Sequence, residues 1–374
     1  MKKLLIIQMV AAAGLFQAVA ETPESVDDMH AEFIALAGGS AEDAVSEEQP
    51  TGYVEYDYVN TVTGSAPYRR TSRGIFVVGK GDSVRSFDTF GGTASSARSY
   101  AASVNRYHQE FPDVRIWVMP IPTASAYYTP DAAANLPKST HEFIRVMFEE
   151  LETGVEGIDL FPVLGEHVDE PIYSRTDHHW APLGAYYAAK AFASAAGVPF
   201  LPLEDYDTHV VEDYVGTMYS FSKDPAVKNA PEDFVYYTPR DIEVSTTYVT
   251  YTLDKARRRV ISQSEPREGK FFLPFKGVST YCTFMGGDSK LTKVVTPTKN
   301  GRRLIILKDS FGNAIPGYLF GSFEEIHVID CRYFTENMKD YVADNAITDI
   351  LFANNATHAS TARTYDMYIT YLNQ

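Results

Sequence analysis

Four consecutive residues near the middle of the chain could do chemistry: Asp177, His178, His179 and Trp180. They place a carboxylate, two imidazoles and an indole directly before a predicted helix. Such a group can bind a metal, or it can supply a general base together with the residue that orients it. It can also be a polar loop at the entry to a helix, with the Trp180 indole packed in the core. The choice depends on which other residues the fold brings to this loop.

A serine that follows a buried strand is the best candidate to work with this loop. Ser310 lies in the run Lys308-Asp-Ser-Phe-Gly-Asn313, directly after the apolar stretch 303–307. A serine at a strand-to-helix turn exposes its hydroxyl, and the backbone N–H groups of the turn can stabilise an oxyanion. On the alternative interpretation, Ser310 or Asp309 only caps the helix.

Two other serines compete with Ser310 for the role of nucleophile, because each follows an aspartate in a Gly-Asp-Ser string. Ser83 follows its strand only after a Gly-Lys-Gly loop and has no helix directly behind it. Ser289, after Gly286 and Gly287, falls in a β-rich segment. Ser310 therefore has the better setting, although the loop at Gly287 can still approach the site and donate a backbone N–H.

A serine hydroxyl is a weak nucleophile unless a base takes its proton and a third group orients that base. His179 and Asp177 supply that pair two residues apart. In an extended loop, residues i and i+2 point the same way, so we expect an Asp177–His179 contact. His178 is then expected to face elsewhere, toward substrate or structure.

A metal site is the competing interpretation of the same residues, since Asp177, His178 and His179 are all possible ligands. Asp-His-His also occurs in metal-dependent phosphoesterases. Those enzymes need further aspartates and histidines on neighbouring strand ends, and the sequence offers only Asp309 there. We therefore expect no metal and no cofactor.

The N-terminus has the features of a secretory signal peptide spanning residues 1–20. Two lysines precede an apolar stretch, 4–16, which ends near the small-residue site Ala18-Val-Ala20. The stretch is shorter than the ~18 residues of a membrane span, so we expect export to the periplasm or beyond, and no span after cleavage. Cleavage would remove two lysines and no acid, moving the net charge from −16 to −18. So acidic a chain is a poor partner for nucleic acid.

The remaining chain is predicted to form an acidic, flexible leader at 21–50 and a single α/β domain at 51–374. Strands alternating with helices predict a mainly parallel sheet, whose working residues lie beyond the C-terminal ends of its strands. A segment at about 203–291, rich in Tyr, Thr and Val, predicts an antiparallel insertion or cap. The expected strands are 75–78, 114–119, 303–307, 325–329 and 349–352, and the expected helices are 94–111, 140–152, 182–196, 313–320 and 336–343. Cys282 and Cys331 can pair in an oxidising compartment, but the sequence does not decide this.

Together, Thr176-Asp-His-His-Trp180, the following Leu183-Gly-Ala185, and Lys308-Asp-Ser-Phe-Gly-Asn313 resemble the bacterial DHHW family. That family is related to SGNH-hydrolase-like proteins, including the alginate O-acetyltransferases. The resemblance runs from about Gly74 to the C-terminus, and 325–333 resembles the family's downstream strand. It implies a flavodoxin-like α/β/α sandwich and a triad of Asp177, His179 and Ser310. It also implies an exported serine esterase or O-acyltransferase that acts on acetyl esters of a polysaccharide.

Two departures from the better-known SGNH hydrolases stand out. The order of the triad is reversed along the chain, and Lys308 stands where those enzymes have a glycine. The motif also leaves the oxyanion asparagine open: Asn354 or Asn355 is the first choice and Asn313 the second, while an ordinary turn explains the Asn354-Asn355 pair equally well. A fold does not imply a function, so the alternative is an inactive polysaccharide-binding or assembly protein on the same fold. The oligomeric state is not predicted.

Overall fold

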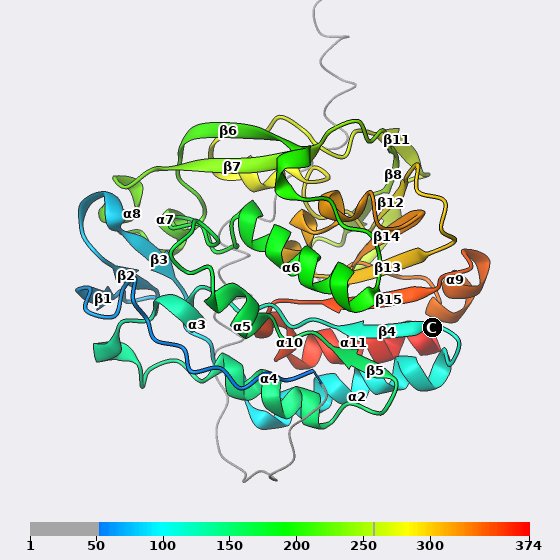
Figure 1. Cartoon of the computed structure of the whole chain (residues 1–374), viewed down its shortest axis with the longest axis horizontal. Coiled ribbons are helices and arrows are strands. Elements are labelled where there is room, and N and C mark those ends of the chain that lie inside the picture. Colours follow the sequence, from blue (N-terminus) through cyan, green and yellow to red (C-terminus); the bar gives the residue numbers. More distant parts are fainter. Residues whose placement is uncertain (1–51, 257–258) are drawn as a thin grey trace, which may run out of the picture.

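An eight-stranded mixed sheet forms the centre of the computed structural model, which describes residues 52–256 and 259–374 (Figure 1). The predicted signal peptide and leader therefore lie outside the described residues. The strand order is β11-β8-β12-β14-β13-β15-β4-β5. The five strands from β14 to β5 are parallel, which confirms the predicted α/β class with a mainly parallel sheet. Their bounds are β14 Glu325–Asp330, β13 Arg303–Lys308, β15 Asp349–Ala353, β4 Arg115–Val118 and β5 Val155–Gly157.

Helices cover both faces of the sheet, and aromatic side chains mark each layer. On one face, Phe352 of β15 packs edge-on against Tyr107 of α2 (Ala94–Glu110) and Tyr368 of α11 (Ala362–Asn373). On the other face, Trp117 of β4 packs against Phe192 of α6 (Pro182–Ala196). α4 (Thr140–Glu149) lies beside α2 (Figure 1). A parallel sheet needs both faces covered in this way, because its strands are apolar throughout.

The segment 203–291 is antiparallel, as predicted, but it is not simply a cap. Two of its strands, β8 (Ser245–Val249) and β11 (Arg267–Gly269), extend the central sheet through β12 (Leu291–Val295). β6 (Tyr206–Tyr214) and β7 (Glu232–Pro239) form a separate ribbon, and β9 (Tyr251–Leu253) pairs with β10 (Val260–Gln263). The added strands give the backbone groups of β12 a partner, which an exposed sheet edge would leave unpaired.

The helix expected at 313–320 is absent, and the chain instead makes two short 3₁₀ segments, η5 (Ser310–Ala314) and η6 (Pro316–Leu319). Pro316 has no N–H to continue a helix from the first segment, which explains the break. The helix expected at 336–343 is α9 (Met338–Asp344). The remaining elements are a small sheet of β1 (Tyr68–Arg70), β2 (Phe76–Val78) and β3 (Arg85–Phe87), α3 (Ser125–Tyr128), α5 (Leu160–Gly165), α7 (Met218–Ser222), α8 (Pro225–Lys228), α10 (Ala356–Ala359), η1 (Gly81–Ser83), η2 (Asp131–Ala133), η3 (Leu203–Asp205) and η4 (Gly277–Thr283).

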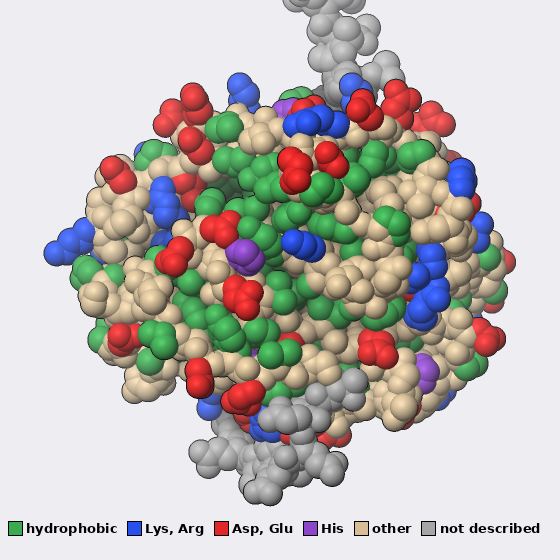
Figure 2. All heavy atoms as spheres, viewed as in Figure 1, with side chains coloured by type: hydrophobic (Ala, Val, Ile, Leu, Met, Phe, Trp, Pro, Cys, Tyr) green, Lys and Arg blue, Asp and Glu red, His purple; other side chains and the backbone are tan. Residues whose placement is uncertain are grey.

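The structure also bears on the predictions about the cysteines, the membrane spans and the surface charge. Cys282 and Cys331 are both free thiols. No helix in the described part of the chain has the length and apolar character needed to cross a bilayer. On the face drawn in Figure 2, Lys and Arg side chains are spread among Asp and Glu and do not gather into one basic surface.

Candidate active site

Asp177, His179 and Ser310 form a continuous chain of contacts at the C-terminal end of β13. His179 Nδ1 lies 2.6 Å from Asp177 Oδ1, and His179 Nε2 lies 2.8 Å from Ser310 Oγ. An ionised carboxylate can only accept, so Nδ1 carries the proton of the neutral ring. Nε2 is then left to accept the proton of the Ser310 hydroxyl. This arrangement can activate Ser310 as a nucleophile.

Asp177 is almost completely buried and has a hydrogen-bond donor at each oxygen. Its Oδ2 accepts from the backbone N of Thr217 at 2.8 Å and from the Thr217 hydroxyl at 2.9 Å. Burial disfavours the charged form, but the neighbouring imidazoles of His178 and His179 and these hydrogen bonds outweigh it, so the pKa of Asp177 is held well below its usual range. A Cβ on Gly216 would collide with the Asp177 side chain, so glycine is needed for this close approach.

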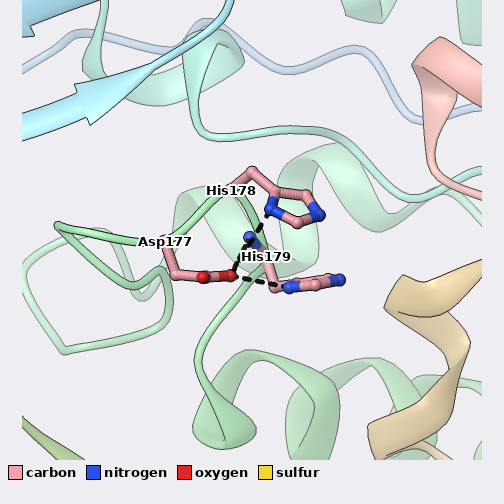
Figure 3. A group of neighbouring side chains, drawn as sticks. All are labelled: Asp177, His178 and His179. Atoms are coloured by element: carbon pink, nitrogen blue, oxygen red, sulfur yellow. Dashed lines mark hydrogen bonds and ion pairs between the residues drawn. The ribbon is translucent and has the colours of Figure 1, made fainter. Parts of the chain in front are cut away.

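His178 does not face away from its neighbour, as the alternation of an extended loop predicted. The chain bends at 175–179, and the ring of His178 lies 3.8 Å from that of His179 between centroids. Figure 3 shows both rings extending from the loop in the same direction. Because the Thr217 hydroxyl donates to Asp177, it accepts from His178 Nδ1 at 2.6 Å. Burial, helped by the adjacent His179 imidazole, lowers the pKa of His178 to about 3, so this ring stays neutral beside the base.

Trp180 and Tyr281 hold the His179 ring against the serine turn. Tyr281, on η4, stacks on His179 with centroids 3.8 Å apart and planes 6° apart. The Trp180 indole and the Tyr281 hydroxyl both donate to the carbonyl of Phe311, at 3.0 and 2.9 Å. Phe311 directly follows Ser310, so the base and the nucleophile are fixed to one another. The packing role predicted for Trp180 is therefore observed, whereas Tyr281 was not predicted.

Within residues 52–256 and 259–374, Asp177, His178 and His179 form the group whose spacing could hold a metal ion. The potential ligand atoms of Asp177, His178 and His179 lie within 4.8 Å of one another. Their facing atoms, however, already bond to each other and to Thr217. The carboxylate of Asp309, the fourth ligand considered from the sequence, instead accepts hydrogen bonds from the backbone N–H groups of Phe311 and Asn355. This donor set fits a hydrogen-bonded catalytic group better than a metal centre.

Asn354, the first choice for an oxyanion donor, is buried just beyond β15. Its Oδ1 accepts from the hydroxyls of Tyr100 at 2.7 Å and Tyr368 at 2.5 Å, and its Nδ2 donates to Asp309 at 3.3 Å. Tyr100 lies on α2 and Tyr368 on α11, so Asn354 ties two helices to the strand end. The hydrogen bonds that the structure shows for this amide are therefore made inside the core.

The other predicted substrate-binding groups also have partners. Asn355 caps α10: its Oδ1 accepts from the backbone N of His358 at 3.1 Å, and its Nδ2 lies 2.9 Å from His358 Nδ1. Asn313 Nδ2 donates to Asp288 at 2.9 Å. The Gly287 N–H donates at 3.1 Å to the carbonyl three residues earlier. Each of these groups therefore has at least one partner within the protein.

The turn at Ser310 uses two of its three amides internally. Phe311 N donates to Asp309 Oδ1 at 2.9 Å, and Gly312 N donates to the Asp309 carbonyl at 3.0 Å. Asp309 Oδ2 also accepts from Asn355 N at 2.8 Å, which joins the ends of β13 and β15. The N–H of Ser310 makes no hydrogen bond within 52–256 and 259–374, so it is available to a ligand at the hydroxyl.

A buried charge cluster supports the other side of the serine turn. Lys308 Nζ lies 2.7 Å from Asp330 and 3.2 Å from Asp288, and Arg332 lies 2.6 Å from Asp288 and 3.0 Å from Asp330. Burial disfavours the charge on Lys308, but the two carboxylates raise its pKa above the ordinary value. Lys308 is therefore a buried cation that joins β13, β14 and the 285–288 loop.

Comparison with protein families gives one match, to the DHHW protein family over residues 44–329. That match contains the Asp177–His179 loop and the Ser310 turn. No curated protein matches the chain.

Several solved structures resemble the chain. A DHHW family protein from Eubacterium siraeum is 36% identical, with a TM-score of 0.72, and the match covers 82% of this chain and 98% of that one. Bacillus cereus PatB1 with a sulfonyl adduct is 18% identical, with a TM-score of 0.59, covering 81% and 98%. The O-acetyltransferase domain of Pseudomonas putida AlgJ is 13% identical, with a TM-score of 0.42, covering 79% and 93%.

Proposed function

The chain belongs to the DHHW family, and on that premise we propose that it is an exported serine esterase or O-acyltransferase. Its substrates are acetyl esters of a cell-surface or extracellular polysaccharide, and its fold is the flavodoxin-like sandwich of SGNH hydrolases. The observation that carries this proposal is the contact chain from Asp177 through His179 to the Ser310 hydroxyl. Helices on both faces of a mainly parallel sheet support the fold assignment.

In the proposed first step, Ser310 Oγ attacks the ester carbonyl while its proton passes to His179 Nε2. The tetrahedral intermediate collapses, the bond to the sugar oxygen breaks, and His179 returns the proton to that oxygen. Asp177 stays ionised throughout and stabilises the imidazolium. The low pKa of Asp177, which follows from the neighbouring His178 and His179 imidazoles and from its four hydrogen-bond donors, supports this role.

In the second step, a hydroxyl attacks the acetyl-Ser310 ester and passes its proton to His179. The Ser310–acetyl bond breaks, and the proton returns to Ser310. Water as the attacking group gives hydrolysis, and a sugar hydroxyl gives transfer. In both steps we assign the Ser310 N–H as an oxyanion donor, since it is not used by the turn.

Turnover of 4-nitrophenyl acetate tests the proposal. A covalent mechanism predicts a burst of nitrophenolate that approaches one equivalent per chain when deacetylation is slower than acetylation. Adding acetylated and deacetylated oligosaccharides then separates transfer from hydrolysis, by measuring acetate release and acetylated acceptor. No turnover above the buffer rate with any acetyl ester would contradict the proposal.

One surface feature favours the second candidate, a glycan-binding protein without activity. A depression of about 500 Å³ beside α6 is lined by Tyr186, Tyr187, Lys190, Phe200 and Glu204, among others. Aromatic rings with a few polar groups suit sugar stacking. Glycan binding that is unchanged in Ser310→Ala, combined with no ester turnover, would favour this candidate.

A further inference from the structure

The side chain of Glu232, on β7 of the outer ribbon, is bound by the loop that carries Asp177 and His179. Its Oε1 accepts from Ser174 Oγ at 2.7 Å, Thr176 N at 2.7 Å and Thr176 Oγ1 at 2.7 Å. Both oxygens also accept from Arg175 N, at 2.8 and 2.9 Å. One carboxylate therefore holds three consecutive residues, and Asp177 is the next in the chain.

The same carboxylate is linked to the second support of Asp177. Glu232 pairs in register with Tyr214, the last residue of β6, and the chain continues from there to Gly216 and Thr217. The Gly216 N–H donates to Thr176 Oγ1 at 3.1 Å, while Thr217 donates twice to Asp177. The loop that precedes Asp177 and the segment that leads to Thr217 are therefore both attached to Glu232, the first by hydrogen bonds and the second by strand pairing.

The charge of Glu232 is directed at the loop backbone more than at a cation. Arg175 Nε is its nearest charged group, at 3.8 Å, and the Arg175 guanidinium mainly donates to backbone carbonyls, including Val84 at 3.1 Å and Pro231 at 3.0 Å. A carboxylate that accepts several N–H bonds is an effective anchor, since charge-assisted hydrogen bonds are about twice as strong as neutral ones.

We propose that Glu232 is a positioning residue for the base: it sets the place of the Asp177–His179 pair relative to Ser310 from an element far away in sequence. The inference rests on the proposed function of that pair. It makes the β6–β7 ribbon part of the catalytic apparatus. A displacement of about 1 Å at a reacting group can cost about 100-fold in rate, so a shift of this loop is expected to lower kcat.

Three variants test the proposal. Glu232→Ala removes all the acceptors, whereas Glu232→Gln keeps one accepting oxygen but places an N–H against that of Arg175. Asp233→Asn is the matched control, because Asp233 is the exposed neighbour on the same strand. For 4-nitrophenyl acetate, we expect kcat to fall about 100-fold in Glu232→Ala and about 10-fold in Glu232→Gln. KM should stay within about twofold, and Asp233→Asn should match the wild type.

Two further readouts separate positioning from loss of folded protein. Titration with phenylmethanesulfonyl fluoride counts reactive serines, and kcat is expressed per reactive site. The downfield proton resonance of the His179 Nδ1–H bond to Asp177 should shift or broaden in Glu232→Gln and stay unchanged in Asp233→Asn. An unchanged resonance and an unchanged kcat per site would overturn the inference while leaving the proposed function intact. A wild-type protein that neither turns over esters nor reacts would refute the proposed function, and this inference with it.

Discussion

Ser310→Ala is expected to lower kcat/KM for an acetyl ester by about 10⁴- to 10⁶-fold, the range seen when a triad nucleophile is removed. The alanine keeps the turn but deletes the oxygen that forms the acyl bond, so His179 is left without a nucleophile to activate. Initial rates on 4-nitrophenyl acetate measure the loss, and a thermal melt shows whether the fold is kept.

The two competing serines provide matched controls for this result. Ser83 lies on η1, and its hydroxyl donates to the Lys80 carbonyl at 2.8 Å. Ser289 follows the Asp288 loop, and neither serine has a histidine partner among the described hydrogen bonds. Ser83→Ala and Ser289→Ala should therefore keep wild-type rates. Full activity in Ser310→Ala, or a comparable loss in either control, would contradict the assignment of the nucleophile.

Lys308→Met is expected to lower the free energy of unfolding by about 3–5 kcal/mol, the usual cost of removing one partner of a buried ion pair. Lys308 is 1% exposed, and its loss leaves Asp330 and Asp288 inside the protein with Arg332 as their remaining cation. Methionine has a similar length, so the lost charge and not a cavity accounts for the change. Urea unfolding followed by circular dichroism measures it.

Lys293→Met is the control for this stability prediction. Lys293 lies on β12 and is 2.7 Å from Glu325, the same separation as in the Lys308–Asp330 pair, but its side chain is 33% exposed. Solvent screening limits such a pair to about 0–1 kcal/mol. Equal losses from the two substitutions would show that burial does not determine the contribution of Lys308.

Local patterns in the sequence were sufficient for four of the five parallel strands, all except β5, and for the contact between Asp177, His179 and Ser310. The apolar run before Lys308 is long enough to be a buried strand, and a serine directly after such a strand must lie at its C-terminal end. The two-residue spacing of Asp177 and His179 allows their contact within one loop. Each of these predictions needs only a short stretch of chain and a general rule about strand ends.

The residues that support this loop were not predictable in the same way. Thr217, Glu232 and Tyr281 contact the loop from the β-rich segment, 40 to 101 residues away in sequence. No motif marks them, since a threonine, a glutamate and a tyrosine in a Tyr- and Thr-rich region look like ordinary strand residues. His178 was misplaced because the loop bends where an extended chain was assumed. The two tyrosine hydroxyls that bond to Asn354 were not predictable either, because only the packing of α2 and α11 brings them to it.

Covalent labelling tests the central claim, that Asp177 and His179 activate Ser310, most directly. Phenylmethanesulfonyl fluoride is a suitable reagent, because an activated serine hydroxyl attacks its sulfur and displaces fluoride. Mass spectrometry of the labelled protein, followed by peptide mapping, gives the number of sulfonyl groups and their position. The account predicts one group per chain, on Ser310, with labelling that is lost in His179→Gln and protected by an acetyl ester. An unlabelled wild type, a label on another residue, or equal labelling of His179→Gln would contradict it.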